Sequence, residues 1–415
     1  MAAPRILGRA CRRVNSIEEL FKEVHGCLPA LGVRVPGRVN LIGEHIDYND
    51  LPVFPMALQR SVRIALSPRN DPMVVLHSAD DRFSPVEFEI GPELEPSRKG
   101  SWANYVKAPA KELAHRFNMQ RGFDGVLQSD IPVASGLSSS SAIVNAVGLA
   151  LAHINEISTE PRDFASVMAE AERFVGTQGG GMDQAISLGA RDRSAAKISF
   201  HPLRLQHVLV PDDWCFVIAD SGEVAEKSGA LQAEYNLRRA QCEQALEIVV
   251  QNLVHEGRTG DPFESYPELC EALDTQRMLV FAEEVLTETL YRRFRHAVTE
   301  ADRVEGAVQR MVAADIRGFG DLMNASHESL RMDCQVSSAE LDELVQIARG
   351  GGAMGARLTG AGFGGCVVAL AERHRVDDVL AALRIGYFAR RGPMERMNER
   401  LFVAVPSRGA SIRQI

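Results

Sequence analysis

The sequence predicts a protein of mixed α and β structure, built as two α+β halves. At 415 residues the chain is too long for one ordinary hydrophobic core. Hydrophobic residues make up 45% of it and charged residues 24%, which is typical of a soluble globular protein. Short apolar runs of strand type dominate up to about residue 200, and long segments of helical spacing dominate after it. These observations together favour two domains.

Strands and helices alternate in the first half. A helical spacing that begins at Ile17 predicts the first helix, and Pro109 predicts that a later helix is kinked or split. Two short strand pieces are expected on either side of a loop, at 33–35 and 39–41. The further predicted strands are 61–66, 73–77, 86–90 and 123–128. The predicted helices are 17–27, 102–117, 139–154 and 164–173.

A domain boundary is predicted near residues 200–212, because His201-Pro202 and Pro211-Asp212 interrupt the pattern there. We therefore expect one domain at 1–205 and a second at 206–415. The second half should open with a buried strand at 214–219. The helices predicted after it are 232–254, 278–288, 290–311, 316–330 and 338–349, and the late strands are 365–370 and 401–405.

Charge and cysteine usage narrow the class of partner. The net charge of −9 argues against nucleic acid or an anionic membrane as the main partner. No apolar run approaches the roughly 20 residues of a membrane span. The seven cysteines are scattered and form no C-x-x-C pair, so a disulfide framework or a structural zinc site is not expected. We expect a cytoplasmic monomer that binds small molecules.

The densest cluster of polar residues is Pro36-Gly37-Arg38-Val39-Asn40-Leu41-Ile42-Gly43-Glu44-His45-Ile46-Asp47-Tyr48. It follows neither a strand nor a helix period. Such a cluster suits a small ligand with many hydroxyl groups, because each buried polar group without a partner costs about 1–3 kcal/mol.

A second segment joins a strand to an apolar helix and reads Ile131-Pro132-Val133-Ala134-Ser135-Gly136-Leu137-Ser138-Ser139-Ser140-Ser141-Ala142. A helix N-terminus offers free N–H groups and a partial positive charge, so it can bind phosphate without a basic residue. The serine hydroxyls could bind phosphate oxygens or Mg²⁺. The alternative is an ordinary serine-capped helix. The segment lacks the G-x-x-x-x-G-K-[ST] pattern of a Walker loop.

Two further glycine loops carry candidate chemistry. Gly176-Thr177-Gln178-Gly179-Gly180-Gly181-Met182-Asp183-Gln184 allows close backbone approach to a ligand. Asp183 is then a general base, a phosphate-region anchor or simply a turn residue, and Glu172 is a candidate Mg²⁺ ligand. The other loop, Arg357-Leu358-Thr359-Gly360-Ala361-Gly362-Phe363-Gly364-Gly365-Cys366, leads into an apolar strand and is a weak signal alone.

Together these four segments resemble the signature motifs of the GHMP sugar kinases, with the closest similarity to the galactokinase branch. Residues 37–49 resemble its G-R-V-N-L-I-G-E-H-x-D-Y-N signature, and 136–142 resemble its phosphate motif. Further similarity is seen at 102–107, 234–239 and 322–327, so the resemblance extends from about residue 17 to the C-terminus.

The resemblance implies a two-domain fold: an N-terminal domain with a left-handed β-α-β crossover, a ferredoxin-like C-terminal domain and an active site between them. It implies transfer of the γ-phosphoryl group of ATP, with Mg²⁺, to the anomeric hydroxyl of galactose. Arg38 and Asp183 then form the catalytic pair. Asp183 would accept the proton of the sugar or mainly orient and stabilise charge.

The remaining site residues also follow from the resemblance. Arg38, Glu44, His45, Asp47, Gly180, Asp183 and Tyr235 would bind the sugar. Trp102 and Ser135, Gly136, Leu137, Ser138, Ser139, Ser140 and Ser141 would bind ATP. Ser140, or Ser139 in an alternative alignment, and Glu172 would hold Mg²⁺. Arg357 and the glycines after it are expected to support the phosphate loop. His45 and Trp102 have plain structural roles as alternatives.

Ile46, the extra Ser141 and the three successive glycines depart from the commonest galactokinase pattern. They resemble the branch that holds plant galactokinases and N-acetylgalactosamine kinases, so an N-acetylgalactosamine 1-kinase or another sugar 1-kinase is the alternative. A non-catalytic sugar and ATP sensor is a second alternative. A mevalonate-type kinase does not fit the signature at 37–49.

Overall fold

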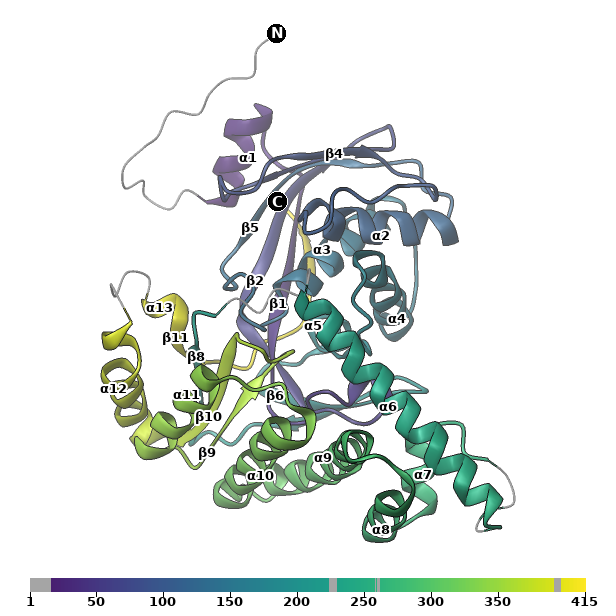
Figure 1. Ribbon diagram of the computed structural model, residues 1–415. Helices are drawn as coiled ribbons and strands as arrows, with labels where there is room; N and C mark the ends of the chain where they lie inside the picture. The colour runs from purple at the N-terminus through teal and green to yellow at the C-terminus, as the bar shows by residue number, and fades with distance from the viewer. Residues whose placement is uncertain (1–15, 224–229, 258, 260–261, 392–396) are drawn as a thin grey trace.

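The computed structural model describes residues 16–223, 230–257, 259, 262–391 and 397–415. Its first sheet has six strands in the order β12-β1-β2-β5-β3-β4 (Figure 1). All neighbouring pairs are antiparallel except β3 and β5. The strands are β1 (Leu31–Asn40), β2 (Pro55–Pro68), β3 (Met73–Ser78), β4 (Val86–Glu89), β5 (Phe123–Ser129) and β12 (Ser411–Gln414).

Strand β1 passes without a break through the position where a loop was predicted. The expectation of two strand pieces was wrong: β1 pairs with β2 along its length, and the register shifts between Pro36 and Arg38. A bulge of this kind absorbs the residues that cannot continue a regular ladder. Arg38 consequently lies within a sheet strand, which holds its backbone in a defined position.

Helices cover both faces of this sheet. Helix α1 (Ile17–His25) packs Ile17 and Phe21 against Ala65 and Val126, on one face. Neighbouring side chains of β2 point the other way into the main core, as the two-residue period of a strand requires. Helices α3 (Ser139–Ile154) and α5 (Met182–Gly189) pack on the opposite face, and α2 (Ala103–Arg116) and α4 (Pro161–Glu172) pack against α3 (Figure 1). The connection from β3 to its parallel partner β5 runs through β4 and α2.

Two local expectations in this region need correction. Pro109 lies inside α2 but does not split it. The segment that follows the three glycines was treated as a loop, whereas Met182 begins α5 and Asp183 lies in its first turn. By contrast, the predicted helix at 139–154 is confirmed as α3, with the same limits.

The predicted boundary region contains a hairpin that the sequence pattern did not reveal. Strands β6 (Ser194–Ser199) and β7 (Arg204–Leu209) pair antiparallel, and His201-Pro202 lies in their turn. A division at residue 205 therefore falls inside β7, and β12 returns from the C-terminus to β1. The two-domain division at 1–205 and 206–415 stays a proposal.

The second sheet has four strands in the order β11-β8-β10-β9, all antiparallel. They are β8 (Trp214–Asp220), β9 (Gly355–Thr359), β10 (Cys366–Glu372) and β11 (Leu401–Ala404). Helix α11 (Ala339–Gly350) precedes β9, and α12 (Val376–Gly386) lies between β10 and β11. This β-α-β-β-α-β order is the ferredoxin-like arrangement that the resemblance implies. Strand β9 and helix α12 were not predicted. The short helix α13 (Met397–Arg400) leads directly into β11.

Five α-helices lie between β8 and α11 in the part of the chain that the structure describes. They are α6 (Ala230–His255), α7 (Tyr266–Ala272), α8 (Thr275–Val285), α9 (Glu288–Val312) and α10 (Ile316–Ser329). Helices α9 and α10 match the predicted segments closely, while α7 was missed. Helix α10 packs on one face of the second sheet, where Phe319 meets Trp214 and Phe216. Val217 and Ala219 point to the other face, against α11 and α12.

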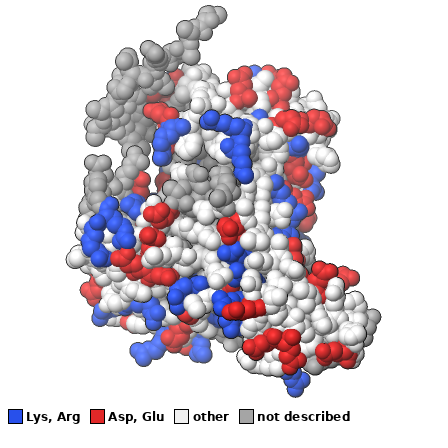
Figure 2. Space-filling view, in the orientation of Figure 1, with Lys and Arg blue, Asp and Glu red and all other residues white. Residues whose placement is uncertain are grey.

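On the face shown in Figure 2, basic and acidic side chains are interspersed rather than separated by sign. No helix in the described parts of the chain combines the length and the apolar character needed to cross a membrane.

Candidate active site

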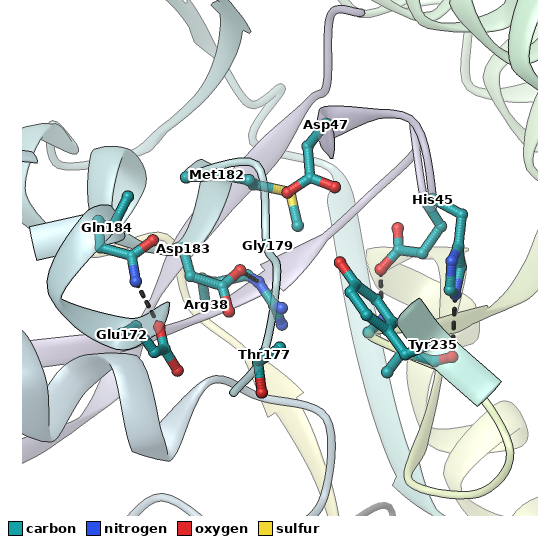
Figure 3. A pocket seen from close by; sticks show the side chains of 15 residues that line it. Arg38, His45, Asp47, Glu172, Thr177, Gly179, Met182, Asp183, Gln184 and Tyr235 are labelled. Atoms are coloured by element: carbon teal, nitrogen blue, oxygen red, sulfur yellow. Dashed lines mark hydrogen bonds and ion pairs between the residues drawn. The ribbon is translucent and has the colours of Figure 1, made fainter. Parts of the chain in front are cut away.

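One cavity brings together most of the residues that were predicted to bind the sugar, together with Glu172 (Figure 3). Strand β1 contributes Arg38, the loop after it contributes Glu44, His45 and Asp47, and α6 contributes Tyr235. Glu172 comes from the end of α4 and Asp183 from the start of α5. The other described lining residues are Ala169, Thr177, Gly179, Gly181, Met182, Gln184, Gly360 and Ala361.

Arg38 and Asp183 form a buried ion pair at this cavity. The Arg38 Nε atom donates to Asp183 Oδ1 at 2.7 Å, and Arg38 Nη1 donates to the Gly136 carbonyl at 2.5 Å. Burial alone would lower the pKa of Arg38, but the carboxylates of Asp183, Glu44 and Asp47 raise it. The guanidinium therefore stays charged, and its two hydrogen bonds join the segment at 135–141, called the serine loop below, to the acid.

The backbone around Asp183 explains its position. Gly181 adopts φ 101°, which a residue with a side chain rarely does, and it lets α5 begin at once after the glycine run. An acid in the first turn of a helix is stabilised by the free N–H groups there. Ser138 also donates its hydroxyl hydrogen to Asp183 Oδ2. The carboxylate is thus oriented from both oxygens.

Serines at and before the start of α3 contact the two acids of the cavity, Glu172 and Asp183. Ser138 has a left-handed backbone and contacts Asp183, whereas Ser141 Oγ lies 2.7 Å from Glu172 Oε2 and 3.3 Å from Asp183 Oδ2. Ser135 instead donates to the Pro132 carbonyl at 2.9 Å. The Leu137 carbonyl accepts the backbone N–H of Arg38 at 3.2 Å. The loop is therefore tied to β1 by its backbone and to the two acids by its hydroxyls.

The candidate metal ligands lie next to each other. Ser140 Oγ is 3.2 Å from Glu172 Oε1, and Gln184 donates its amide to the other oxygen of Glu172. One hydroxyl and one carboxylate fit Mg²⁺, which takes oxygen ligands and is commonly held by one or two carboxylates together with substrate phosphates. Among the described residues, no group of three or more His, Cys, Asp or Glu side chains could hold a metal ion alone.

Glu44 is fully engaged with the C-terminal glycine loop. Arg357 donates both terminal nitrogens to Glu44 Oε2 at 3.1 Å, and the Gly360 N–H donates to Oε1. Burial raises the pKa of Glu44, although Arg357 and Arg38 act in the opposite direction. Arg357 was expected to support the phosphate loop; it holds Glu44 instead. The glycine after it does meet that loop, because a Cβ on Gly360 would lie 2.7 Å from the Gly136 carbonyl oxygen.

His45 has partners within the chain on both ring nitrogens. Its Nε2 lies 2.9 Å from the Ala361 carbonyl, which can only accept, so Nε2 carries the hydrogen. Nδ1 then accepts from the Tyr48 hydroxyl at 3.0 Å. The rings of His45, Tyr48 and Tyr235 pack with centroids 5.2–5.8 Å apart. Burial raises the pKa of Tyr235 well above its ordinary value, so its hydroxyl stays protonated.

Asp47 and Gly180 connect the first loop to the glycine run. The Gly180 N–H donates to Asp47 Oδ2 at 3.1 Å. A Cβ on Gly180 would lie only 2.1 Å from the carbonyl carbon and oxygen of Asp47, so glycine is required for this approach. Gly180 itself does not appear among the described residues that line the cavity, whereas its neighbours Gly179 and Gly181 do.

Trp102 lies away from these groups. It precedes the first residue of α2, its ring packs edge-on against Phe83, and its Nε1 donates to the Ser84 carbonyl at 2.9 Å. Neither Trp102 nor Ser135–Ser141 belongs to the described lining of the cavity. Thr177, Gln184 and Ala361 do belong to it and were not predicted as site residues. Gln184 had a usable signal, since it directly follows Asp183 in the glycine loop at 176–184.

Comparison with known protein families agrees with this arrangement. Residues 19–68 match the galactokinase galactose-binding signature, 104–190 match the N-terminal domain of the GHMP kinases, and 306–388 match their C-terminal region. The galactokinase of Chloroflexus aggregans is 38% identical over 383 residues, covering 91% of this chain and 93% of the relative. The galactokinase of Actinobacillus succinogenes is 34% identical, covering 94% and 97%.

Solved structures of other proteins share the fold of this chain. The crystal structure of Lactococcus lactis galactokinase complexed with galactose aligns with a TM-score of 0.83 and 29% identity, covering 95% of this chain and 98% of that one. The mevalonate kinase of Methanococcus jannaschii aligns at 16% identity and a TM-score of 0.57, covering 93% and 97%, and so shares the fold alone. By its sequence over nine-tenths of its length, this chain belongs to the galactokinase family of the GHMP sugar kinases.

Proposed function

We propose that the protein transfers the γ-phosphoryl group of ATP to the anomeric hydroxyl of galactose, giving galactose 1-phosphate and ADP. The observation that carries this is the buried Arg38–Asp183 pair, set between the sugar-signature residues and the serine loop. In the reaction, the bond from sugar O1 to the γ-phosphorus forms and the bond from the γ-phosphorus to the bridging oxygen of ADP breaks. Such transfer depends mainly on positioning and on stabilising the charge of the phosphoryl oxygens.

Asp183 would accept the hydrogen of the sugar O1 hydroxyl. Arg38 and Ser138 donate hydrogen bonds to its two oxygens and hold the carboxylate in one orientation. This supports a role in which Asp183 first orients the hydroxyl and takes its proton as the new bond forms. Arg38 would place its positive charge beside the migrating group, where a fixed charge is most effective.

The nucleotide would lie with its phosphates at the N-terminus of α3, where Ser135, Gly136, Leu137 and Ser138–Ser141 offer N–H groups and hydroxyls. Trp102 would border the adenine. Ser140 and Glu172 would hold Mg²⁺, which neutralises charge on the β- and γ-phosphate oxygens when bound. The 3.2 Å approach of these two side chains supports this assignment.

The sugar would contact Arg38, Glu44, His45, Asp47, Gly180, Asp183 and Tyr235. Glu44 and His45 already have partners within the chain, so each would exchange or share one of those bonds with a sugar hydroxyl. We also propose that the protein is a cytoplasmic monomer whose substrates are small molecules.

N-acetylgalactosamine is a second candidate acceptor. Gly179 lines the cavity, and a Cβ built there would meet nothing within 4 Å, so the space beside this glycine is open. A larger acceptor could use this space. A sensor without activity is less well supported, because Arg38, Asp183, Ser140 and Glu172 are all present and in contact as pairs.

The test is ADP release from ATP and Mg²⁺ with galactose, N-acetylgalactosamine, arabinose, glucose and galacturonate. Galactose should give the highest kcat/KM, and the product should be a sugar 1-phosphate by ³¹P NMR. Turnover of N-acetylgalactosamine alone would select the second candidate. Absence of turnover with both sugars would refute a galactose-type kinase.

A further inference from the structure

The loop of residues 41–46, called the sugar loop below, has an irregular backbone that needs outside support. Gly43 has φ 99° and His45 has φ 60°, and the second value is uncommon for a residue with a side chain. The side chains of Glu44 and His45 line the cavity. Any displacement of this backbone would therefore move two of the groups expected to read the acceptor sugar.

Helix α9 supplies that support along one face. His296 Nε2 lies 2.9 Å from the Glu44 carbonyl, and Glu300 Oε1 accepts the Gly43 N–H at 2.9 Å. A Cβ on Gly43 would lie 2.9 Å from Cγ2 of Val304, so that residue packs closely against the loop. Positions 296, 300 and 304 are spaced four residues apart, and such residues share one side of a helix.

The His296 contact has a defined direction. A carbonyl only accepts, so the hydrogen lies on Nε2. Nδ1 lies 2.9 Å from Ser329 Oγ, whose hydroxyl also reaches Asp333 Oδ2 at 3.1 Å. Burial lowers the pKa of His296, which keeps this imidazole neutral near pH 7. Loss of the ring would leave the Glu44 carbonyl without that donor.

The Glu300 carboxylate accepts hydrogen bonds from two further side chains. Arg303 Nε donates to its Oε2 at 2.6 Å, and Ser326 Oγ donates to its Oε1 at 2.6 Å. Burial by itself would raise the pKa of Glu300, yet Arg303, Arg357 and His296 lower it to about 2. The carboxylate is ionised and completely buried.

His296 and Glu300 are buried polar side chains, with exposed fractions of 1% and 0%. Burying a polar side chain is unfavourable unless it forms hydrogen bonds, so the partners of these two residues matter for stability. Among the described residues that line the cavity, none comes from α9. Each of the two side chains forms a hydrogen bond with the backbone of the sugar loop, and neither lines the cavity.

We infer that His296 and Glu300 are positioning residues that hold the peptide groups of Gly43 and Glu44, and so set the affinity for the acceptor sugar without touching it. The inference rests on the proposed sugar 1-kinase activity. It places the effect on sugar binding and not on ATP binding, because the serine loop has its own ties to β1 and to Asp183.

The experiment compares His296→Phe, which keeps the ring shape but removes the donor, with His296→Gln, whose amide can still donate to the Glu44 carbonyl. Val298→Ala is the matched control, because Val298 is a buried core residue on the same helix. Steady-state KM and kcat are measured for sugar and for ATP, using whichever sugar the wild type phosphorylates. The rise in Tm caused by that sugar alone and by ATP with Mg²⁺ is measured in parallel, so a weakly active variant still gives a reading.

His296→Phe should raise the KM for the sugar by roughly tenfold, the effect of losing one buried hydrogen bond, while the KM for ATP changes less than twofold. His296→Gln should recover most of the sugar affinity. The inference is wrong if His296→Phe and Val298→Ala change the sugar KM equally, or if the sugar and ATP affinities fall together. Failure of the proposed function would look different, since the wild type itself would then phosphorylate no sugar.

Discussion

The Arg38 guanidinium donates a 2.7 Å hydrogen bond to the carboxylate of Asp183, a residue 145 positions later in the chain. Both residues are nearly buried, at 2% and 7% exposure. β1 carries the arginine and the first turn of α5 carries the acid, and Ser138 from a third segment bonds to the same carboxylate. The charge pair therefore depends on three separate loops or elements being in place at once.

Replacing Asp183 with Asn should lower kcat by at least about 10²-fold, because the amide cannot take the proton of the sugar hydroxyl and carries no charge. ADP release with saturating sugar measures the change. Asp81→Asn, at an exposed acid, is the control and should have wild-type activity. Asp183→Asn should still bind ATP in a calorimetric titration; near-normal turnover would contradict the assigned role.

Glu172→Gln should raise the Mg²⁺ concentration needed for half-maximal activity by roughly tenfold or more, because a neutral amide is a poorer ligand for a hard cation. A titration of activity against Mg²⁺ at fixed ATP measures this. Glu170→Gln on the same helix is the control, since Glu170 pairs with Arg116 near the surface. An unchanged Mg²⁺ requirement in Glu172→Gln would exclude Glu172 as a ligand.

Gly180→Ala and Gly179→Ala should behave very differently although they are neighbours. An added Cβ at Gly180 would collide with the backbone of Asp47, whereas one at Gly179 would meet nothing within 4 Å. We expect Gly180→Ala to lower the free energy of unfolding by about 1–3 kcal/mol and to weaken sugar binding. Gly179→Ala should leave stability equal or slightly higher. Urea unfolding and the sugar KM of both variants decide the matter, and equal effects would contradict the close approach of Gly180 to Asp47.

Acidification should destabilise the protein partly through His327. Burial lowers the pKa of His327 to about 4, further assisted by Arg357 and opposed by Asp342. The unfolded chain, with a pKa near 6.5, binds this proton first, so the stabilising contribution is complete above pH 6.5 and is lost as the pH falls toward 4. At pH 5 the loss is roughly 2 kcal/mol.

The measurement is the free energy of unfolding between pH 7 and pH 4.5 for the wild type and for His327→Asn, whose amide oxygen can replace Nδ1 as acceptor of the Leu358 N–H. The wild type should lose more stability than the variant over this range. His374→Asn, at an exposed histidine, should follow the wild type. Parallel curves for the wild type and His327→Asn would show that His327 does not titrate in this way.

Long helices with a regular apolar period were predictable from the sequence. Helix α3 has the predicted limits, and α9 and α10 differ from theirs by one or two residues, because a repeated apolar stripe marks the buried face. Strand β12 was missed because Ser411–Gln414 is only four residues long and mostly polar. Its place is decided by pairing with β1, and such pairing leaves no local pattern in a short edge strand.

The candidate site was predictable as a set of residue types but not as a set of contacts. The signature around Arg38 indicated a small ligand with many hydroxyl groups, and the serine segment at 131–142 indicated a phosphate site. Nothing local predicted that Asp183 would lie in the first turn of a helix, since three glycines before an acid are more typical of a turn. Nor did the sequence indicate that both ring nitrogens of His45 would find partners within the chain.

The amino-acid sequence was enough to show which loops carry acids, hydroxyls and glycines, and which family those loops resemble. The partners of those groups became apparent from the folded chain. Glu44 bonds to Arg357, 313 residues away, and the loop that carries Glu44 is held by His296 and Glu300 of α9. Local sequence biases the backbone dihedral angles and the burial of each residue. Hydrogen bonds between residues far apart in the chain form only when the packed core brings donor and acceptor within about 3 Å of each other.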